Sequence, residues 1–274
     1  MQGKRILITG GNSGIGLVAA RELARAGNEV VLASRDTEKT QRALTEINAV
    51  AATPAVNLPV DLASLASVRA LAERFLAEYD RLDVLVNNAG LFPTRQQFTA
   101  DGFEMQFGVN HLSHFLLTHL LLDRLRDSAP ARVVNVSSKL HAKGKIDFDS
   151  FRGMAKYDAQ AAYGQSKLAN VLFSAELAAR LEGSGVTSNA LHPGGVATDI
   201  VRDLPWVVRK LLGFIFISPE EGAKTTIMLA SDPELDDVNG AYFDQCRRRE
   251  PSPLAQDESL RTRLWDVSAE LAGI

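Results

Sequence analysis

The chain alternates short, largely apolar runs with longer stretches in which apolar residues recur every three or four positions. Short runs rich in β-branched residues predict buried strands, and the longer periodic stretches predict amphipathic helices. The expected strands cover residues 5–9, 29–33, 55–60, 82–86, 132–136 and 187–191. The expected helices cover residues 15–26, 37–50, 65–79, 102–126, 159–181 and about 253–271.

The regular alternation of strand and helix is typical of an α/β fold with a doubly wound parallel sheet. Right-handed crossovers then place helices on both faces in a Rossmann-like arrangement, with ligands bound beyond the carboxyl ends of the strands. Neither a linker nor a repeat divides the sequence, so residues 1–274 are expected to form a single domain. Two stretches depart from the alternation and are expected to be loops over the ligand site: residues 139–158 are polar and irregular, and residues 199–218 are apolar.

Composition narrows the class of protein. Hydrophobic residues make up 46% of the chain and charged residues 23%, which is typical of a globular protein with a sizeable core. The 30 basic and 33 acidic side chains leave a net charge of -3, which argues against an electrostatic grip on nucleic acid or on acidic membranes. A membrane-spanning helix needs roughly 20 apolar residues in a row, and no stretch approaches that length. The single cysteine, Cys246, cannot form an intrachain disulfide, so a cytoplasmic protein is expected.

The turn after the first expected strand is rich in glycine, and a helical pattern follows it at once. Glycine permits a tight turn and lets the backbone approach a pyrophosphate, whose charge the helix N-terminus stabilises. Such a turn is common by itself, but its place in the first strand-helix unit favours a dinucleotide site. The residues expected to line this site are Gly10, Asn12, Ser13, Gly14, Ile15 and Gly16.

The second expected strand ends in Ser34, Arg35 and Asp36, where the adenosine ribose of a dinucleotide would lie. An acidic residue there accepts from the 2′-hydroxyl of NAD, whereas the 2′-phosphate of NADP requires a cation. Ser34 and Arg35 therefore favour NADP(H) over NAD(H). Two alternatives stay open: Asp36 pairs with Arg35 or reaches the ribose itself, and Arg35 is only an exposed residue at a helix start.

The third and fourth expected strands also end in polar or small residues. Asp61 and Leu62 follow the third strand, and Asn88, Ala89 and Gly90 follow the fourth. Small residues admit the ribose and amides hold its hydroxyls, while Asp61 is expected to accept from the adenine amino group. The alternative for residues 87–90 is an ordinary loop after a strand.

A tyrosine and a lysine four positions apart open a long helical pattern. The spacing places Tyr163 and Lys167 on one helix face, where the ammonium can depress the pKa of the phenol. A tyrosine ordinarily titrates near about 10, so it needs such a neighbour to exchange a proton near neutral pH. Ser137 and Ser138 end the fifth strand, and Asn110 lies in the preceding helix.

These motifs occur in an order that resembles the short-chain dehydrogenase/reductase family, and together they span almost the whole chain. The residues that carry the resemblance are the Thr-Gly-x-x-x-Gly-x-Gly turn from Thr9, residues 87–90, Asn110, the serine after the fifth strand, Tyr163, Lys167, Pro193 and Gly194. Residues 109–115, 166–170 and 242–246 resemble the retinol dehydrogenase-like branch of that family.

The resemblance implies a role for each matching residue. Tyr163 would be the general acid/base, Lys167 would lower its pKa and hold the nicotinamide ribose, and Ser138 would bond the substrate oxygen. Because side chains alternate along a strand, only one of Ser137 and Ser138 should face the substrate, and the resemblance implies that it is Ser138. Asn110 would hold a water that connects Lys167 to solvent; its alternative is a polar helix residue that bonds the backbone. The remaining residues expected to contact the cofactor are Pro193, Val196 and Thr198.

No catalytic metal is expected. His111, His114 and His119 recur along one helical pattern, but no nearby carboxylate or cysteine completes a set of ligands. Histidines satisfied within the fold are the commoner case.

The sequence thus predicts an NAD(P)-binding enzyme that uses NADP(H) to interconvert an alcohol and a carbonyl. The apolar loop at 199–218 is expected to cover a small apolar substrate such as a retinol, a steroid, a lipid aldehyde or a xenobiotic ketone. A non-catalytic NADP(H)-binding sensor or scaffold is the main alternative, and an enzyme of nucleotide-linked sugars is another. The family resemblance also implies a homodimer or homotetramer.

Overall fold

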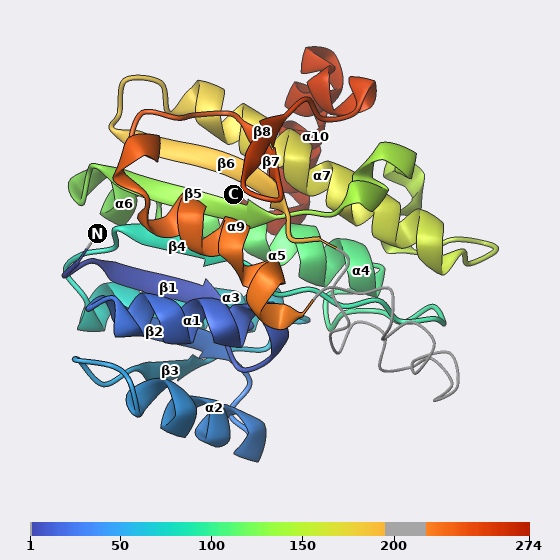
Figure 1. The fold of residues 1–274 in the computed structure, drawn as a ribbon. Coiled ribbons are helices and arrows are strands. Elements are labelled where there is room, and N and C mark those ends of the chain that lie inside the picture. Colours follow the sequence, from blue (N-terminus) through green and yellow to red (C-terminus); the bar gives the residue numbers. More distant parts are fainter. Residues whose placement is uncertain (1, 195–217) are drawn as a thin grey trace.

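The computed structural model describes residues 2–194 and 218–274, which form one sheet with helices on both faces (Figure 1). The sheet has eight strands in the order β3-β2-β1-β4-β5-β6-β7-β8, and every neighbouring pair is parallel except β7 and β8. The strands are β1 (Arg5–Thr9), β2 (Glu29–Ser34), β3 (Val56–Pro59), β4 (Val84–Asn87), β5 (Ala131–Val136), β6 (Val186–His192), β7 (Tyr242–Asp244) and β8 (Arg247–Arg249).

The helices form two layers. In one layer, α1 packs against α9 and α2; in the other, α3, α5, α7 and α10 pack together (Figure 1). The α-helices are α1 (Gly14–Arg25), α2 (Glu38–Asn48), α3 (Leu65–Glu78), α4 (Met105–Phe107), α5 (Ser113–Leu120), α6 (Leu122–Asp127), α7 (Ala159–Arg180), α9 (Pro219–Ser231) and α10 (Glu258–Ala272). The shorter helical turns are η1 (Gly108–Leu112), η2 (Lys139–Lys143), η3 (Phe148–Arg152), η5 (Pro233–Leu235) and η6 (Pro253–Gln256).

The predicted doubly wound parallel sheet is confirmed, and so are all six expected strands, with small shifts at their ends. The stretch expected as one helix over 102–126 is instead divided into α4, the π-helical turn η1, α5 and α6. The sequence pattern did not predict α9, β7 or β8. The two missed strands have three residues each, too few for a period of two to be recognised.

The central strands divide their side chains between two cores. In β1, Leu7 joins the core that includes α3, α5 and α7, while Ile6 and Ile8 join the core that includes α1 and α9. This alternation follows from the period of two along a strand, and it explains why the strands are apolar at nearly every position. The segment from β1 to β6 is therefore held firmly on both faces.

The last two strands form a hairpin at one edge of the sheet. Gln245 and Cys246 make the turn with positive φ angles of 49° and 58°. The three arginines of β8 are exposed, and the strand runs antiparallel to β7.

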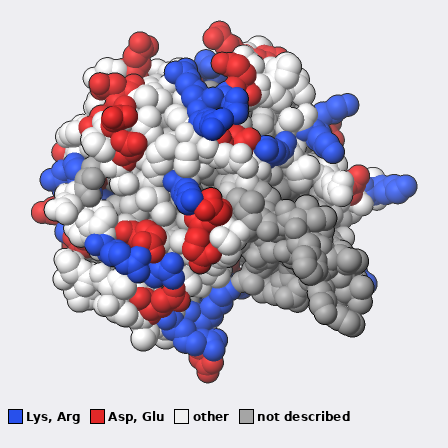
Figure 2. Space-filling model, viewed as in Figure 1, with Lys and Arg blue, Asp and Glu red and all other residues white. Residues whose placement is uncertain are grey.

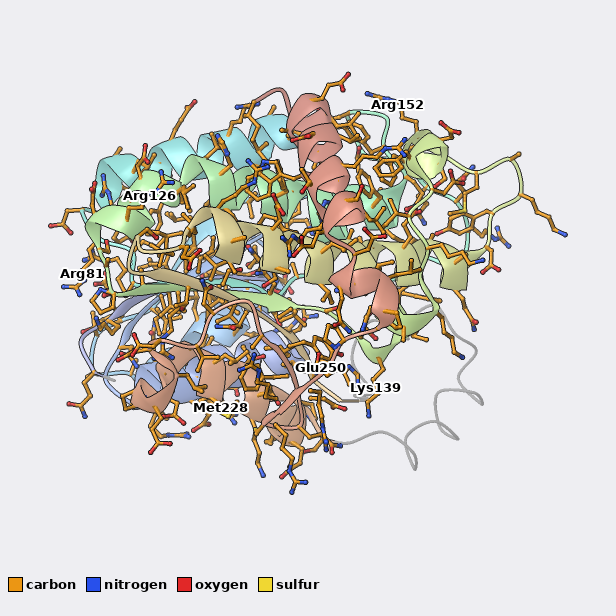
Figure 3. The ribbon with its side chains drawn as sticks, turned by 90° about the horizontal axis from the view of Figure 1, so that it is seen from above. Arg81, Arg126, Lys139, Arg152, Met228 and Glu250 are labelled. Atoms are coloured by element: carbon orange, nitrogen blue, oxygen red, sulfur yellow. The ribbon has the colours of Figure 1, made fainter. Side chains whose placement is uncertain are left out.

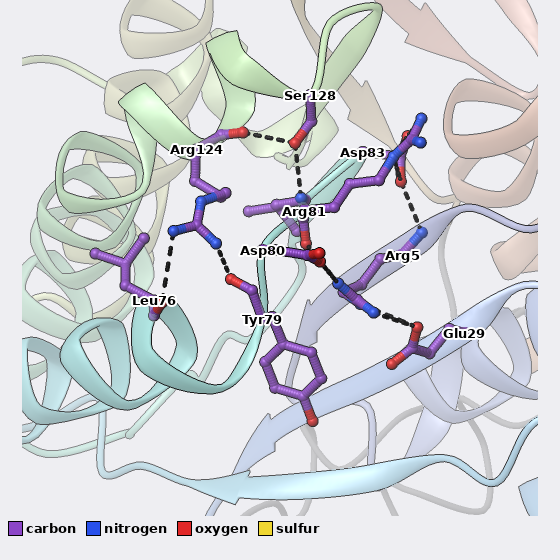
Figure 4. Close-up of polar contacts among 10 residues, drawn as sticks. Arg5, Glu29, Leu76, Tyr79, Asp80, Arg81, Asp83, Arg124 and Ser128 are labelled. Atoms are coloured by element: carbon purple, nitrogen blue, oxygen red, sulfur yellow. Dashed lines mark hydrogen bonds and ion pairs between the residues drawn. The ribbon is translucent and has the colours of Figure 1, made fainter.

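A network of ion pairs lies at the amino ends of the central strands (Figure 4). Asp83, which is 1% exposed, accepts from Lys4 Nζ at 3.0 Å, from the Arg5 amide at 2.8 Å and from Arg81 Nε at 2.8 Å. Burial by itself raises the pKa of this carboxyl, but these donors outweigh burial and hold the pKa below its ordinary value. The network thus joins the start of β1 to the start of β4.

Arginines extend this network over the neighbouring loops. Arg5 also pairs with Glu29 at 2.9 Å and with Asp80 at 2.8 Å, and Arg124 donates to the Tyr79 carbonyl (Figure 4). Seen from above in Figure 3, Arg81 and Arg126 lie near one end of the molecule, whereas Lys139 and Glu250 lie nearer its middle.

The surface carries charges of both signs. On the face shown in Figure 2, basic and acidic side chains are interspersed over the described part of the chain. Within the same residues, no helix has the length and apolar character required to cross a bilayer.

Replacement of Asp83 with asparagine should lower the free energy of unfolding by about 2 kcal/mol, the scale of hydrogen bonds from charged donors to a buried acceptor. The lowered folded-state pKa means that this contribution is complete above the ordinary carboxyl pKa and is lost as the pH falls through the lowered value. Urea unfolding at neutral and acidic pH measures both effects.

Asp80→Asn is the matched control, because the Asp80 side chain is 95% exposed although it pairs with the same Arg5. Its unfolding midpoint should stay near that of the wild-type protein, since exposed ion pairs contribute little. Equal losses in the two variants would contradict the structural role assigned to Asp83.

Candidate active site

The glycine turn between β1 and α1 forms the first wall of the site. Gly10 and Gly14 have positive φ angles of 66° and 52°, a backbone conformation that other residues adopt only with strain. At Gly16 a Cβ atom would lie 2.5 Å from Asn88 Nδ2 and 2.6 Å from the Gly10 carbonyl oxygen. The turn therefore needs glycine both for its backbone angles and for its close packing against the turn after β4.

The three other residues expected in this turn lie beside it. Asn12 donates from Nδ2 to Thr40 Oγ1 at 2.9 Å, which ties the turn to the start of α2. Ser13 is the extended residue before α1, and its side chain makes no capping hydrogen bond. Ile15 is half-buried and packs against the core beneath α1. Because the first turn of α1 has no acidic residue, its N-terminus is favourable for an anion.

Thr9 connects the glycine turn to the turn after β4. Its hydroxyl accepts from the Asn88 amide at 2.9 Å and from the Ala89 amide at 3.0 Å. The Asn88 side chain donates back to the Thr9 carbonyl at 2.8 Å. Asn88 and Ala89 thus contribute to the site chiefly by fixing the two turns relative to each other.

Asn110 lies in the π-helical turn η1 and is fully buried. Its Oδ1 accepts from the Leu91 amide at 2.9 Å, and its Nδ2 donates to the Leu91 carbonyl at 3.1 Å and to Ser166 Oγ at 3.0 Å. Both amide hydrogens are therefore used within the protein. A water held by Asn110 would therefore have to donate to an oxygen of this residue, either Oδ1 or the backbone carbonyl.

The two serines after β5 have different surroundings. Ser137 is 2% exposed and donates from Oγ to the Lys167 carbonyl at 2.7 Å, so its hydroxyl serves the packing of α7. Ser138 is half-buried, caps the start of η2 and hydrogen-bonds the hydroxyl of Tyr163. Of the two, Ser138 is thus the serine that the structure brings to the tyrosine.

Tyr163 and Lys167 lie on α7 and are buried, with exposed fractions of 7% and 2%. Lys167 Nζ lies 5.5 Å from the Tyr163 ring centroid and donates to the Val136 carbonyl at 3.1 Å. Burial raises the pKa of Tyr163 to about 12, although the bond with Ser138 lowers it, and burial lowers the pKa of Lys167 to about 8. Burial disfavours the charged forms of both side chains, and the lowering of the Tyr163 pKa by Lys167 stays a prediction.

The space beside Lys167 fits the ribose of a nicotinamide cofactor. At Gly90 a Cβ atom would lie 3.3 Å from Lys167 Nζ and 3.5 Å from Asn110 Oδ1, so the absence of a side chain keeps this space open. A lysine ammonium has three hydrogens, and within the described residues Lys167 Nζ donates only to Val136. Two hydrogens of the Lys167 ammonium therefore remain to donate to the hydroxyls of the nicotinamide ribose.

The end of β2 places one cation in solvent. Arg35 is exposed and forms no ion pair within the described part of the chain. Asp36 accepts from Gln41 Nε2 at 2.9 Å, so its partner is Gln41 rather than the neighbouring arginine. Ser34 is buried and donates to Asn57 Oδ1 at 2.8 Å. Of these three residues, Arg35 is the one whose side chain is free for a phosphate.

The other expected contacts with the cofactor lie along the same edge. Asp61 is exposed and its Oδ1 accepts from the Ala63 amide at 3.0 Å, while Leu62 is buried. Pro193 is half-buried and follows the last residue of β6. The remaining expectations, Val196, Thr198 and all but the last residue of the loop at 199–218, lie outside the described residues.

In two histidines of the helical pattern, both ring nitrogens form hydrogen bonds within the protein. His111 contacts Asn170 Oδ1 at 3.3 Å and Ser268 Oγ at 3.0 Å. His114 contacts the Asn110 carbonyl at 3.0 Å and Thr9 Oγ1 at 2.9 Å. Their burial within satisfied networks, rather than metal binding, accounts for their place in the sequence.

Sequence reasoning missed three side chains of the site. In the sequence, Thr9 is only one position of the glycine motif, and His114 is only one position of the 109–115 segment and a rejected metal ligand. Phe92 was not considered, yet its ring meets that of Tyr163 edge-on, with centroids 5.2 Å apart. Its position two residues after the 87–90 turn was the available signal, since that turn was already expected at the site.

Comparison with known proteins agrees with this geometry. Residues 4–206 match the family model described as short chain dehydrogenase. Human retinol dehydrogenase 14 is 46% identical over all of this chain and 88% of its own length, and mouse retinol dehydrogenase 13 is 48% identical over 99% of this chain and 84% of its own length.

Solved structures lead to the same family. An uncharacterized protein from Mycobacterium paratuberculosis superposes with a TM-score of 0.81 and 35% identity, covering 99% of this chain and 94% of that one. An NADP active-site complex of RhlG from Pseudomonas aeruginosa has a TM-score of 0.72 and 28% identity, covering 95% of this chain and 97% of that one.

The chain therefore belongs to the short-chain dehydrogenase family, as the order of its motifs predicts. Over its whole length it resembles the retinol dehydrogenase-like branch. It is an oxidoreductase with a nicotinamide cofactor.

Gly16→Ala should abolish saturable binding of the cofactor, because the added methyl group would push Asn88 and the Gly10 carbonyl out of their positions. Fluorescence titration with NADPH measures the loss. Gly183→Ala is the control: Gly183 has a φ of 74° but nothing within 4 Å of its Cβ position, so the variant loses about 1 kcal/mol of stability and keeps binding. Normal binding by the Gly16 variant would show that this turn does not hold the cofactor.

Proposed function

We propose that the protein is an NADP(H)-dependent alcohol dehydrogenase or carbonyl reductase that acts on a small apolar substrate. The juxtaposition of Ser138, Tyr163 and Lys167 beside the open space at Gly90 carries this proposal. The cofactor, when bound, supplies or accepts the hydride. The glycine turn and the N-terminus of α1 would hold its pyrophosphate, and Lys167 would hold its ribose.

Tyr163 would transfer the proton that accompanies the hydride. Because burial raises its pKa to about 12, the hydroxyl is protonated at neutral pH and is suited to donate to a carbonyl oxygen. Ser138 would donate to the same oxygen and hold it against the tyrosine. Lys167, with a pKa of about 8, is largely an ammonium at neutral pH and would stabilise the phenolate left by proton donation. The protonated states of Tyr163 and Lys167 at neutral pH therefore favour reduction of a carbonyl over oxidation of an alcohol.

Two observations support an apolar substrate. Phe92 places a half-exposed aromatic ring against Tyr163, so the surroundings of the reacting oxygen are apolar on that side. The retinol dehydrogenases that this chain resembles are named for an apolar alcohol. Retinol, steroid, lipid aldehyde and xenobiotic ketone remain the candidate classes.

NADP(H) is proposed over NAD(H) on the basis of Arg35. The guanidinium is exposed and unpaired among the described residues, and its forked donors match a phosphate. The NADP complex of RhlG, similar in fold, is consistent with this choice. A cytoplasmic location and a homodimer or homotetramer stay predictions.

Tyr163→Phe should lower the rate of NADPH oxidation with apolar aldehydes and ketones by at least about a hundredfold, because it removes the proton donor. NADPH binding should be nearly unchanged, since the ring and its packing are kept. Tyr79→Phe is the control: Tyr79 lies at the end of α3 beside Arg5, at the amino ends of the strands, so turnover is kept. Turnover by the Tyr163 variant at the wild-type rate would refute this mechanism, whereas wild-type binding without turnover on any carbonyl would favour the sensor hypothesis.

Arg35→Ala should weaken NADPH binding by about tenfold to a hundredfold, the scale of one charge-assisted contact, and leave NADH binding unchanged. Parallel titrations with the two dinucleotides measure the change in preference. Arg126→Ala is the control, because Arg126 lies in α6, just before the amino end of β5, and pairs with Asp123 at 3.0 Å. Equal affinities of the wild-type protein for NADPH and NADH would count against the assignment.

A further inference from the structure

His114 occupies a buried position between the two halves of the site. It lies on α5, one turn after Asn110, and is 2% exposed. Its Nδ1 lies 3.0 Å from the Asn110 carbonyl oxygen, and its Nε2 lies 2.9 Å from Thr9 Oγ1. The proposed mechanism assigns no task to this side chain.

The protons in this network can be assigned from the partners. A carbonyl oxygen only accepts, so His114 Nδ1 must carry a hydrogen and donate to Asn110. The Thr9 hydroxyl already accepts from the amides of Asn88 and Ala89, which use both of its lone pairs, so it must donate. The Val86 carbonyl lies 3.3 Å away and His114 Nε2 lies 2.9 Å away, so the shorter bond runs from Thr9 to an unprotonated Nε2.

The electrostatic surroundings favour this neutral form of the ring. Burial lowers the pKa of His114 to about 4, the bond to Asn110 opposes this, and the nearby charge of Lys167 lowers it further. A second proton on Nε2 would also face a hydroxyl with no free lone pair. The ring therefore keeps one tautomer, with one nitrogen that donates and one that accepts.

Each end of the ring reaches a different part of the site. Through Thr9 it reaches the amides that join the glycine turn to the turn after β4. Through the backbone of Asn110 it reaches a residue whose side chain bonds Leu91 and Ser166, the latter on α7 between Tyr163 and Lys167. No other described side chain bonds both Thr9 and the Asn110 backbone.

We propose that His114 is a positioning residue that keeps the dinucleotide turn and the proton-transfer helix in register through these two hydrogen bonds. This inference rests on the proposed function, because it assumes that NADPH binds at the glycine turn and that protons move through Tyr163 and Lys167. The bond to Thr9 supports cofactor binding, and the bond to Asn110 fixes the carbonyl available to a water of the proton pathway.

Two substitutions separate the two bonds. In His114→Asn the amide nitrogen can replace Nδ1 and donate to Asn110, but the side chain is too short for Thr9. In His114→Gln the amide oxygen can replace Nε2 and accept from Thr9, but the donor to Asn110 is lost.

His114→Asn should weaken NADPH binding by about tenfold and speed hydrogen exchange at the amides of Asn88 and Ala89, with an unchanged pH profile of turnover. His114→Gln should keep binding near the wild-type value but lower kcat by about tenfold and shift the pH profile. Binding is measured by fluorescence titration without substrate, so it does not depend on turnover.

His111→Asn is the matched control, because His111 is 1% exposed on the preceding turn and bonds Asn170 and Ser268, not Thr9 or Asn110. It should lower the melting temperature without changing NADPH affinity or the pH profile. His114 variants that match the His111 variant, losing stability alone, would overturn the inference while leaving the proposed function intact. Failure of the wild-type protein to bind NADPH would overturn both, and if one His114 variant does not fold, the other still tests its own bond.

Discussion

Parallel pairing of β1, β4, β5 and β6 is the constraint on which the candidate site depends. The register aligns Ile8 with Val86, Asn87 with Asn135 and Val136 with Leu191, so the four strands end at one edge of the sheet. The turns that follow these strands are thereby brought together at that edge, although they lie far apart in the sequence. A slip of one residue in β5 would exchange the directions of Ser137 and Ser138, and the serine beside Tyr163 would then face the packing of α7.

Buried charges have different surroundings at the two ends of the sheet. At the amino ends, Asp83 is surrounded by donors, and its negative charge is compensated within the protein. At the carboxyl ends, Lys167 is equally buried but has one backbone acceptor within the described residues. The protein thus leaves the buried Lys167 ammonium with unused hydrogens where a ligand can accept them. It pairs the buried Asp83 carboxylate fully where only stability is required.

Much of the fold and of the site could be predicted from the sequence because the signals are local. The apolar runs identified the strands to within a few residues, and the Tyr163–Lys167 spacing identified one face of α7. The break in the helix after residue 102 could not be predicted, because a π-helical turn leaves the apolar pattern almost unchanged. The partners of Asn110 and His114 come from distant parts of the chain: Leu91 follows β4, Ser166 lies on α7 and Thr9 ends β1. The spacing of residues reveals neither these contacts nor the effect of burial on the pKa of Tyr163.

The arginines of β8 have a consequence for how the folded protein behaves at high concentration. A strand at the rim of a sheet offers unpaired amides and carbonyls to any other extended chain, which is the usual route to aggregation. Here a second copy of the same strand would bring guanidinium groups against guanidinium groups, and their repulsion opposes pairing. The hairpin therefore ends the sheet in a form that discourages its continuation into another molecule, and crowding in the cell should not turn this rim into a nucleus for fibrils.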